Sequence, residues 1–358
     1  MVMTDTSAPA EDGVDDHEGE RPQVGGLAGL LGSGDHKTIG RTWIGASLVF
    51  GLVAFALAAV GALGQIPDGS FPPADTRFRL ATTSRIAMAL LFVVPLFIGL
   101  ATYVVPLQVG ARTIAFPKAA GAALWTWMLG TLVLLGTTAA GGGFRAADPE
   151  LVDLSLLALG LVLVALLLAT VCIVTTIVAL RTPGMSLDRV PVFSWSMLVA
   201  GTVWLLQFGV ALANLALVYV DHHYSAGIAL IGRPETQFSQ LAWVFSQPAV
   251  FALAIPALGI ASDVVATASG ARQPQRGFLL VGIGAFGAFS FGAWAQSAFI
   301  RDLESTAMFI VASVAVGLPL FLVLGAWLAV LVKGRPSFGA PLVAALLGAE
   351  EYGFATAP

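Results

Sequence analysis

Residues 154–180 read LSLLALGLVLVALLLATVCIVTTIVAL and contain no charged side chain. A helix rises about 1.5 Å per residue, so about 20 apolar residues can cross about 30 Å of hydrocarbon. This stretch is therefore predicted to span a membrane. The whole chain has the same character, because it is 57% hydrophobic and 11% charged with a mean hydropathy of +0.88. Such a composition excludes an ordinary water-soluble protein.

Eight apolar stretches follow one another along the chain, separated by short connections that contain proline, glycine or charge. The predicted spans are 42–64, 85–105, 119–140, 154–180, 193–220, 241–262, 277–299 and 305–332. They predict an all-α membrane domain over residues 34–335. A last apolar stretch, 338–349, is too short to cross. It is expected to lie on the surface or against the bundle, within a C-terminal segment 336–358.

Acidic residues are concentrated before the first span. Seven of them lie in the first 20 residues, although the net charge of the chain is only −4. This polar stretch without aromatics predicts a disordered tail over residues 1–33. It lacks the basic start and short apolar run of a cleaved signal peptide. The single cysteine, Cys172, excludes an internal disulfide or a cysteine-held metal cluster, and nothing indicates nucleic-acid binding.

Basic residues are distributed unequally between the two sets of loops. One set holds Lys37, Arg41, Arg112, Lys118, Arg181, Arg189, Arg272, Arg276, Lys333 and Arg335, and the other holds Arg77, Arg79, Arg85, Arg145, Arg233 and Arg301. Short cytoplasmic loops carry the excess of Lys and Arg in membrane proteins. We therefore expect an integral protein of a prokaryotic plasma membrane, with both termini in the cytoplasm.

Specific motifs stand at the ends of the spans. Residues 35–40 read DHKTIG before the first span, and residues 106–111 read PLQVGA after the second. Later motifs are AFPK at 115–118, RTPGMSLDRVPVFSW at 181–195, LAWVFSQPAVF at 241–251 and WAQSAF at 294–299. On physical grounds alone, Asp35 is expected to cap the first helix and His36 to be a solvated boundary residue.

In their order and spacing, these motifs resemble subunit I of the haem-copper terminal oxidases, such as cytochrome c oxidase subunit I, over roughly residues 30–335. The resemblance implies a fold like the first eight helices of that subunit, which has about twelve. It also implies haem and copper as the family's cofactors, cytochrome c oxidation as its activity, and other membrane subunits and the lipid bilayer as partners.

The resemblance also shows where metal ligands are missing. Ser84 stands where the family has a histidine axial to the low-spin haem, and Gln247, Gln296 and Ser297 stand at its three copper-binding histidines. Haem iron needs a strong axial donor, and copper at such a site needs imidazole. A hydroxyl or a carboxamide is neither basic nor soft enough. We predict that the chain alone binds neither haem nor copper.

The proton-path positions differ in the same way. By the resemblance, Ala249 replaces a proton-delivering glutamate, Phe251 a tyrosine cross-linked near the copper, and Thr113 the acid that opens one proton path. The lysine of the other path falls at Pro319. No catalytic residue is therefore predicted at these positions.

Several polar residues remain within or beside the spans. Gln247 and Gln296 either hydrogen-bond to each other or each satisfy a nearby backbone carbonyl. Gln207 and Asn214 share one helix face, which indicates helix contacts more than a transport path. Asp263 is expected in a solvated, cap-like position at the end of its span.

Two other charged or polar groups suggest sites at the end of the spans that is predicted to face away from the cytoplasm. Arg85 is expected to extend outward or to pair with Asp302 or Glu304, or else to block haem entry. The cluster Asp221-His222-His223-Tyr224 is a weak candidate for zinc or copper, because a structural site needs four ligands. The alternative is a polar surface loop that contacts a partner.

The function hypothesis that fits these features is a catalytically silent, subunit I-like membrane protein. It would be a structural, assembly or regulatory subunit of a respiratory or other membrane enzyme complex. The alternative is a fragment or split half of a working oxidase in aerobic electron transport, whose missing helices and ligands another chain supplies. A transporter or channel is disfavoured by the near absence of buried carboxylates.

Overall fold

The computed structural model describes residues 34–63, 73–144, 148–224, 234–290, 305–337 and 339–346. Within these ranges the side chains of 74, 75, 78, 234–251, 305–310, 312 and 313 are not described. The elements are α2 (His36–Leu63), α3 (Ala74–Ala87), the π-helix η1 (Met88–Val93), α4 (Val94–Val109), α5 (Pro117–Ala139), α6 (Pro149–Ala179), the 3-10 helix η2 (Leu187–Arg189), α7 (Val192–Tyr224), α8 (Pro234–Ser269), α9 (Arg276–Ser290) and α10 (Ser305–Lys333). The described chain is all helical.

Seven helical segments in the described ranges are long and apolar enough to cross a membrane, and α9 is a shorter apolar helix. The predicted all-α membrane fold of about eight helices is therefore confirmed. The second span is longer than predicted, because the polar helix α3 continues through η1 into α4. The arginines of α3 lower the local hydropathy but do not end the helix.

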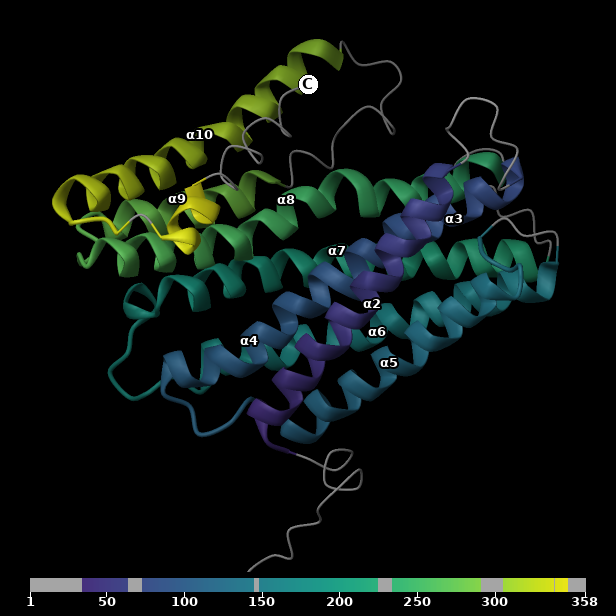
Figure 1. Cartoon of the computed structure of the whole chain (residues 1–358), viewed down its shortest axis with the longest axis horizontal. Coiled ribbons are helices and arrows are strands. Elements are labelled where there is room, and N and C mark those ends of the chain that lie inside the picture. Colours follow the sequence, from purple (N-terminus) through teal and green to yellow (C-terminus); the bar gives the residue numbers. More distant parts are fainter. Residues whose placement is uncertain are drawn as a thin grey trace, which may run out of the picture. The chain divides into compact units, whose positions relative to one another are not determined.

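Most helices that follow one another along the chain pack side by side in antiparallel directions (Figure 1). α5 packs along α6, α6 along α7 and α7 along α8, while α2 packs against α4 and α9 against α10. We call the end at which α2 begins and α4 ends the basic end, because its loops carry most of the Lys and Arg residues. Loop contacts at this end include hydrogen bonds from the Thr182 N–H and hydroxyl to the Val109 carbonyl, at 3.0 and 2.8 Å.

Asp35 caps the start of α2, as predicted. Its carboxylate accepts from the Thr38 N–H at 3.0 Å and from the Thr38 hydroxyl at 2.8 Å. Partial burial would raise the pKa of the Asp35 carboxyl, but these hydrogen bonds outweigh burial and the pKa lies below its ordinary value. The expectation for His36 was wrong: its side chain is 7% exposed, because the first turn of α2 packs into the bundle.

Two glycines bring α2 and α4 into close contact. A Cβ on Gly40 would lie 2.9 Å from the Gly99 carbonyl oxygen and 2.9 Å from the Tyr103 backbone nitrogen. A Cβ on Gly99 would lie 2.8 Å from the Cβ of Trp43. Small residues allow membrane helices to approach in this way, since lipid provides little hydrophobic force between them.

The π-helix η1 ends at Val93, two residues before Pro95, which has no N–H to continue an α-helical ladder. The Val94 N–H bonds the Ala89 carbonyl instead of the Leu90 carbonyl. The Leu90 carbonyl accepts from the indole Nε1–H of Trp127 on α5 at 3.1 Å. Trp127 is fully buried, and its ring packs on Trp43 at 4.6 Å and edge-on to Phe50 at 5.4 Å.

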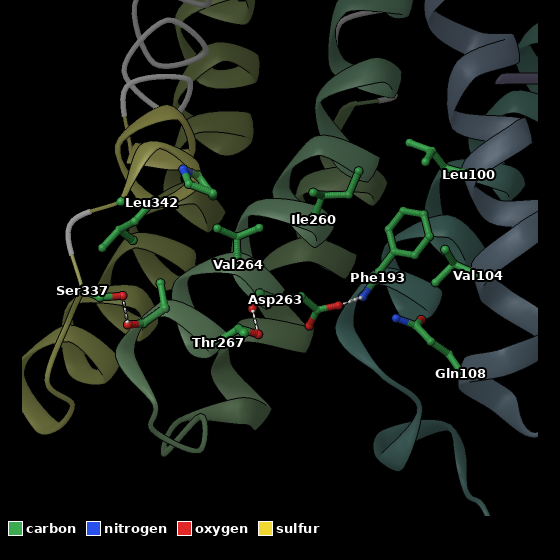
Figure 2. Close-up of a pocket in the computed structure, with 13 residues that line it drawn as sticks. Leu100, Val104, Gln108, Phe193, Ile260, Asp263, Val264, Thr267, Ser337 and Leu342 are labelled. Atoms are coloured by element: carbon green, nitrogen blue, oxygen red, sulfur yellow. Dashed lines mark hydrogen bonds between the residues drawn. The ribbon is translucent and has the colours of Figure 1, made fainter. Parts of the chain in front are cut away.

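The segment after α10 returns along α8 (Figure 2). The Ser337 N–H donates to the Ala268 carbonyl at 3.0 Å, and residues 340–346 form a short helix in which Leu342 is fully buried. The described residues of this apolar stretch are mostly exposed and contact the bundle through Leu342, which fits both alternatives expected for it, the surface and the side of the bundle.

Candidate functional site

Ser84 lies in the last turn of α3, 5% exposed, and its hydroxyl donates to the Ala81 carbonyl of the same helix at 3.0 Å. This is the position that the resemblance matches to a haem ligand. Its oxygen is weakly basic and already engaged with the backbone, so Ser84 does not fit a haem iron. Arg85 is exposed. Asp302 and Glu304, the two acids predicted as its alternative partners, lie outside the described residues, so the choice between the three alternatives stays a prediction.

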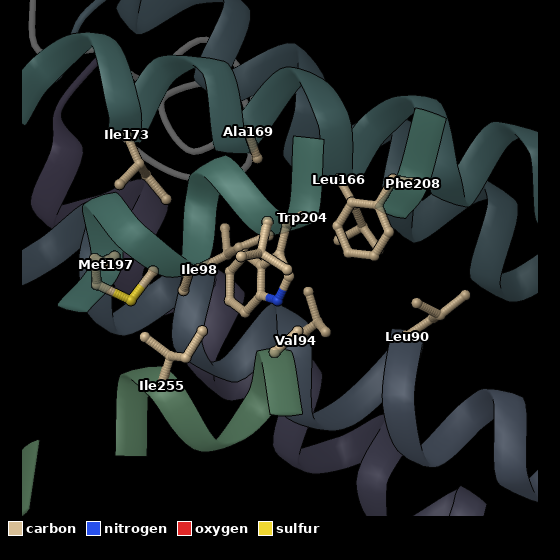
Figure 3. Close-up of a cluster of buried hydrophobic side chains, with 14 of the residues drawn as sticks. Leu90, Val94, Ile98, Leu166, Ala169, Ile173, Met197, Trp204, Phe208 and Ile255 are labelled. Atoms are coloured by element: carbon tan, nitrogen blue, oxygen red, sulfur yellow. The ribbon is translucent and has the colours of Figure 1, made fainter. Parts of the chain in front are cut away.

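The core between η1, α4 and α7 is filled by side chains (Figure 3). Trp204 and Phe208 of α7 pack at 6.2 Å between ring centroids, against Leu90, Val94 and Ile98. The cavity enclosed by Leu90, Val94, Trp204, Phe208 and their neighbours has a volume of about 10 Å³. That volume holds a single water molecule at most.

The other predicted positions are described only in part. Gln247, Ala249 and Phe251 lie on α8, but their side chains are outside the described residues, as are Gln296 and Ser297 entirely. The predicted hydrogen bond between Gln247 and Gln296 therefore stays a prediction.

Four described residues complete this set, and one of them, Pro319, is buried inside α10. Thr113 is half-buried in the loop between α4 and α5. Its hydroxyl has no hydrogen-bond partner within the described part of the chain. On α7, Gln207 is 2% exposed and Asn214 is half-buried.

A polar network that the sequence did not predict joins three helices at the basic end. The Asp263 carboxylate of α8 accepts from the Phe193 N–H in the first turn of α7 at 3.2 Å. Gln108 of α4 lines the same pocket as Asp263, and its amide oxygen accepts from the Ser194 hydroxyl of α7. Asp263 is therefore not a solvated cap of its own helix. It supplies an acceptor and a negative charge to the N-terminus of α7.

The histidine pair occupies a different setting from the one predicted. Helix α7 continues to Tyr224, so His222 and His223 lie in its last turn rather than in a loop. The Nδ1 atoms of both imidazoles lie 2.7 Å from the two carboxylate oxygens of Asp153 on α6. The ring of His223 also stacks on Tyr219 at 5.4 Å.

This arrangement joins two helices. The sequence grouped the histidines with the adjacent Asp221, whereas the structure gives them Asp153, a residue 69 positions before His222. No group of three or more His, Cys, Asp or Glu side chains with metal-site geometry occurs among the described residues. The candidate zinc or copper site at Asp221, His222 and His223 stays a prediction.

Asp153→Asn is expected to lower the free energy of unfolding by about 1–2 kcal/mol, because the amide offers one acceptor oxygen where the carboxylate offers two. Thermal unfolding of the purified protein in detergent measures this change. Glu150→Gln, a change at an exposed acid in the first turn of α6, is the comparison variant and should have a smaller effect. Equal losses in the two variants would contradict the role assigned to Asp153.

Comparisons with known proteins match residues 38–356 to the family described as cytochrome c and quinol oxidase polypeptide I. The heme-copper oxidase subunit I+III of Aeropyrum pernix is 29% identical over 336 residues, covering 87% of this chain and 40% of that protein. The probable cytochrome c oxidase subunit 1-alpha of Streptomyces avermitilis is 28% identical, covering 86% of this chain and 56% of that protein. The probable subunit 1-beta of Nocardia farcinica is 28% identical, covering 91% and 58%.

These relatives are longer than the present sequence. The chain spans about half the length of the curated relatives it matches. The similarity extends over nearly all of the chain, including every described helix from α2 onward.

Proposed function

Because this chain belongs to the family of cytochrome c and quinol oxidase polypeptide I, we propose that it is a catalytically silent, subunit I-like integral membrane protein. It acts as a structural, assembly or regulatory subunit of a respiratory or other membrane enzyme complex. Its partners are other membrane subunits, and both its termini face the cytoplasm. It associates through helix packing and has no redox step of its own.

The observation that carries this proposal is the burial and the hydrogen bond of the Ser84 hydroxyl. A haem ligand must direct a basic lone pair at the iron, whereas the Ser84 hydroxyl is buried and donates to the Ala81 carbonyl. The substitutions at Gln247, Gln296 and Ser297 support the same conclusion, because none of these side chains offers copper an imidazole nitrogen.

Purified from its native membrane in mild detergent, the chain is expected to show no haem absorbance and no reduced-minus-oxidised difference bands. An intact oxidase of the family, prepared in the same detergent and at the same protein concentration, is the control. Stoichiometric haem bound to the chain alone would contradict the proposal.

The second candidate function is that of one half of a working haem-copper oxidase. It is favoured by the match to the family model over residues 38–356, because the relatives that the chain resembles are named as oxidase subunits. A second polypeptide rich in intramembrane histidine, purifying one to one with this chain and with haem, would support this candidate. A haem-free assembly with an intact oxidase would support the first.

A further inference from the structure

A groove of about 680 Å³ opens beside the polar network at the basic end (Figure 2). Its walls come from α4, the start of α7, α8 and the segment after α10. Most wall residues are apolar: Leu100, Val104, Phe193, Ile260, Val264, Ala268, Pro341 and Leu342. Grooves of this size with apolar walls and a few fixed polar groups are typical of small-molecule sites.

The polar end of the groove carries an acid without a close cation. Asp263 lines the groove, and no described Lys, Arg or His nitrogen lies within 4.0 Å of its carboxylate. Arg276 acts on Asp263 only through space, because its guanidinium donates to the Asp188 and Val190 carbonyls. A half-buried carboxylate beside apolar walls attracts a cationic hydrogen-bond donor strongly, since water screens the charge only in part.

We propose that this groove binds one amine-headed phospholipid. The ammonium group donates to the Asp263 carboxylate, and one acyl chain lies along Leu100, Val104 and Val264. Lipid is favoured over a protein partner because Leu100, Val104 and Val264, along which the acyl chain lies, belong to membrane-spanning helices. The groove also has the volume of a small-molecule site, whereas a stable protein interface buries upwards of about 1,000 Å². The site is independent of whether the chain is catalytically silent.

The test is native mass spectrometry of the full chain, released from detergent containing equal amounts of phosphatidylethanolamine and phosphatidylglycerol with identical acyl chains. One phosphatidylethanolamine is expected per chain, with a preference over phosphatidylglycerol of about 10-fold or more, as for one charge-assisted hydrogen bond. Equal retention of the two lipids would overturn the proposal.

Two variants assign the site. Asp263→Asn keeps an acceptor for the Phe193 N–H but removes the charge, so the headgroup preference should fall to about 2-fold or less. Asp188→Asn, an equal charge change in the exposed turn η2, should leave the preference unchanged. An unchanged preference in Asp263→Asn, or an equal loss in Asp188→Asn, would contradict the role of Asp263.

A third variant tests the wall. Val264→Trp fills the groove without touching the carboxylate, and should lower retention of phosphatidylethanolamine about 10-fold while circular dichroism and elution volume stay those of the wild type. Full retention in this variant would overturn the proposal. So would a photo-reactive residue at position 264 that cross-links a stoichiometric polypeptide, and no lipid, in native membranes.

Discussion

Gly40→Leu is expected to separate α2 from α4 and to lower the free energy of unfolding by at least about 3 kcal/mol. Even a Cβ at this position would lie 2.9 Å from the Gly99 carbonyl oxygen and from the Tyr103 nitrogen. Both atoms belong to the backbone of α4 and cannot rotate away as a side-chain terminus could. The whole helix must shift, which also disturbs the contact of Trp43 with Trp127.

The control for this variant lies on the same helix. A Cβ on Gly45 meets no atom within 4 Å, and this residue is exposed. Gly45→Leu therefore adds the same volume to α2 without a clash and should change stability by less than about 0.5 kcal/mol. The yield of monodisperse protein and its unfolding in a denaturing detergent measure both variants. Equal behaviour of the two would show that the close contact between α2 and α4 is unimportant.

Trp127→Phe is expected to lower the free energy of unfolding by about 2–4 kcal/mol. The substitution removes the donor that satisfies the Leu90 carbonyl, which the π turn leaves without its usual backbone partner. No water is available in hydrocarbon to replace the indole N–H, so the carbonyl remains buried and unsatisfied. The smaller ring also leaves a cavity beside Trp43 and Phe50.

The matched variant is Trp125→Phe, two residues earlier on α5. Trp125 is partly exposed, so it should lose less than about 1 kcal/mol. Denaturant unfolding monitored by far-ultraviolet circular dichroism compares the two. A loss in Trp125→Phe as large as that in Trp127→Phe would mean that neither the full burial of Trp127 nor its hydrogen bond to η1 sets the effect.

The helices could be predicted from sequence because hydrocarbon imposes a length and an apolar composition on each span. Helix α6 runs from Pro149 to Ala179 and contains the predicted stretch 154–180 except for its last residue. The prediction failed where a helix continues beyond the apolar stretch, as in α3. There Arg79 donates to the Gly141 carbonyl, a contact between residues 62 positions apart that hydropathy does not report.

The candidate sites were predicted less well, because they depend on contacts between helices. Asp263 shows in the sequence only as an acid at the end of a span, and nothing indicates that it accepts from the Phe193 N–H. The pairing of Asp153 with His222 and His223 is hidden for the same reason. The assignment of Ser84 to the haem-ligand position, in contrast, comes from the resemblance alone, through the motifs on either side of it, and stays a prediction.

The π turn at Met88–Val93 has a consequence for how this chain tolerates insertions and deletions. A π turn accommodates one additional residue, and each residue of a helix advances the azimuth by about 100°. Removing one residue from η1 would restore regular winding and leave α3 at nearly the same azimuth relative to α4, because the π turn had absorbed that residue. Removing one residue from the α-helical turn that contains Ser84 would instead rotate everything before it by about 100°, so that Arg79 would turn away from Gly141. A one-residue deletion in this span is thus harmless at the π turn and disruptive one turn earlier.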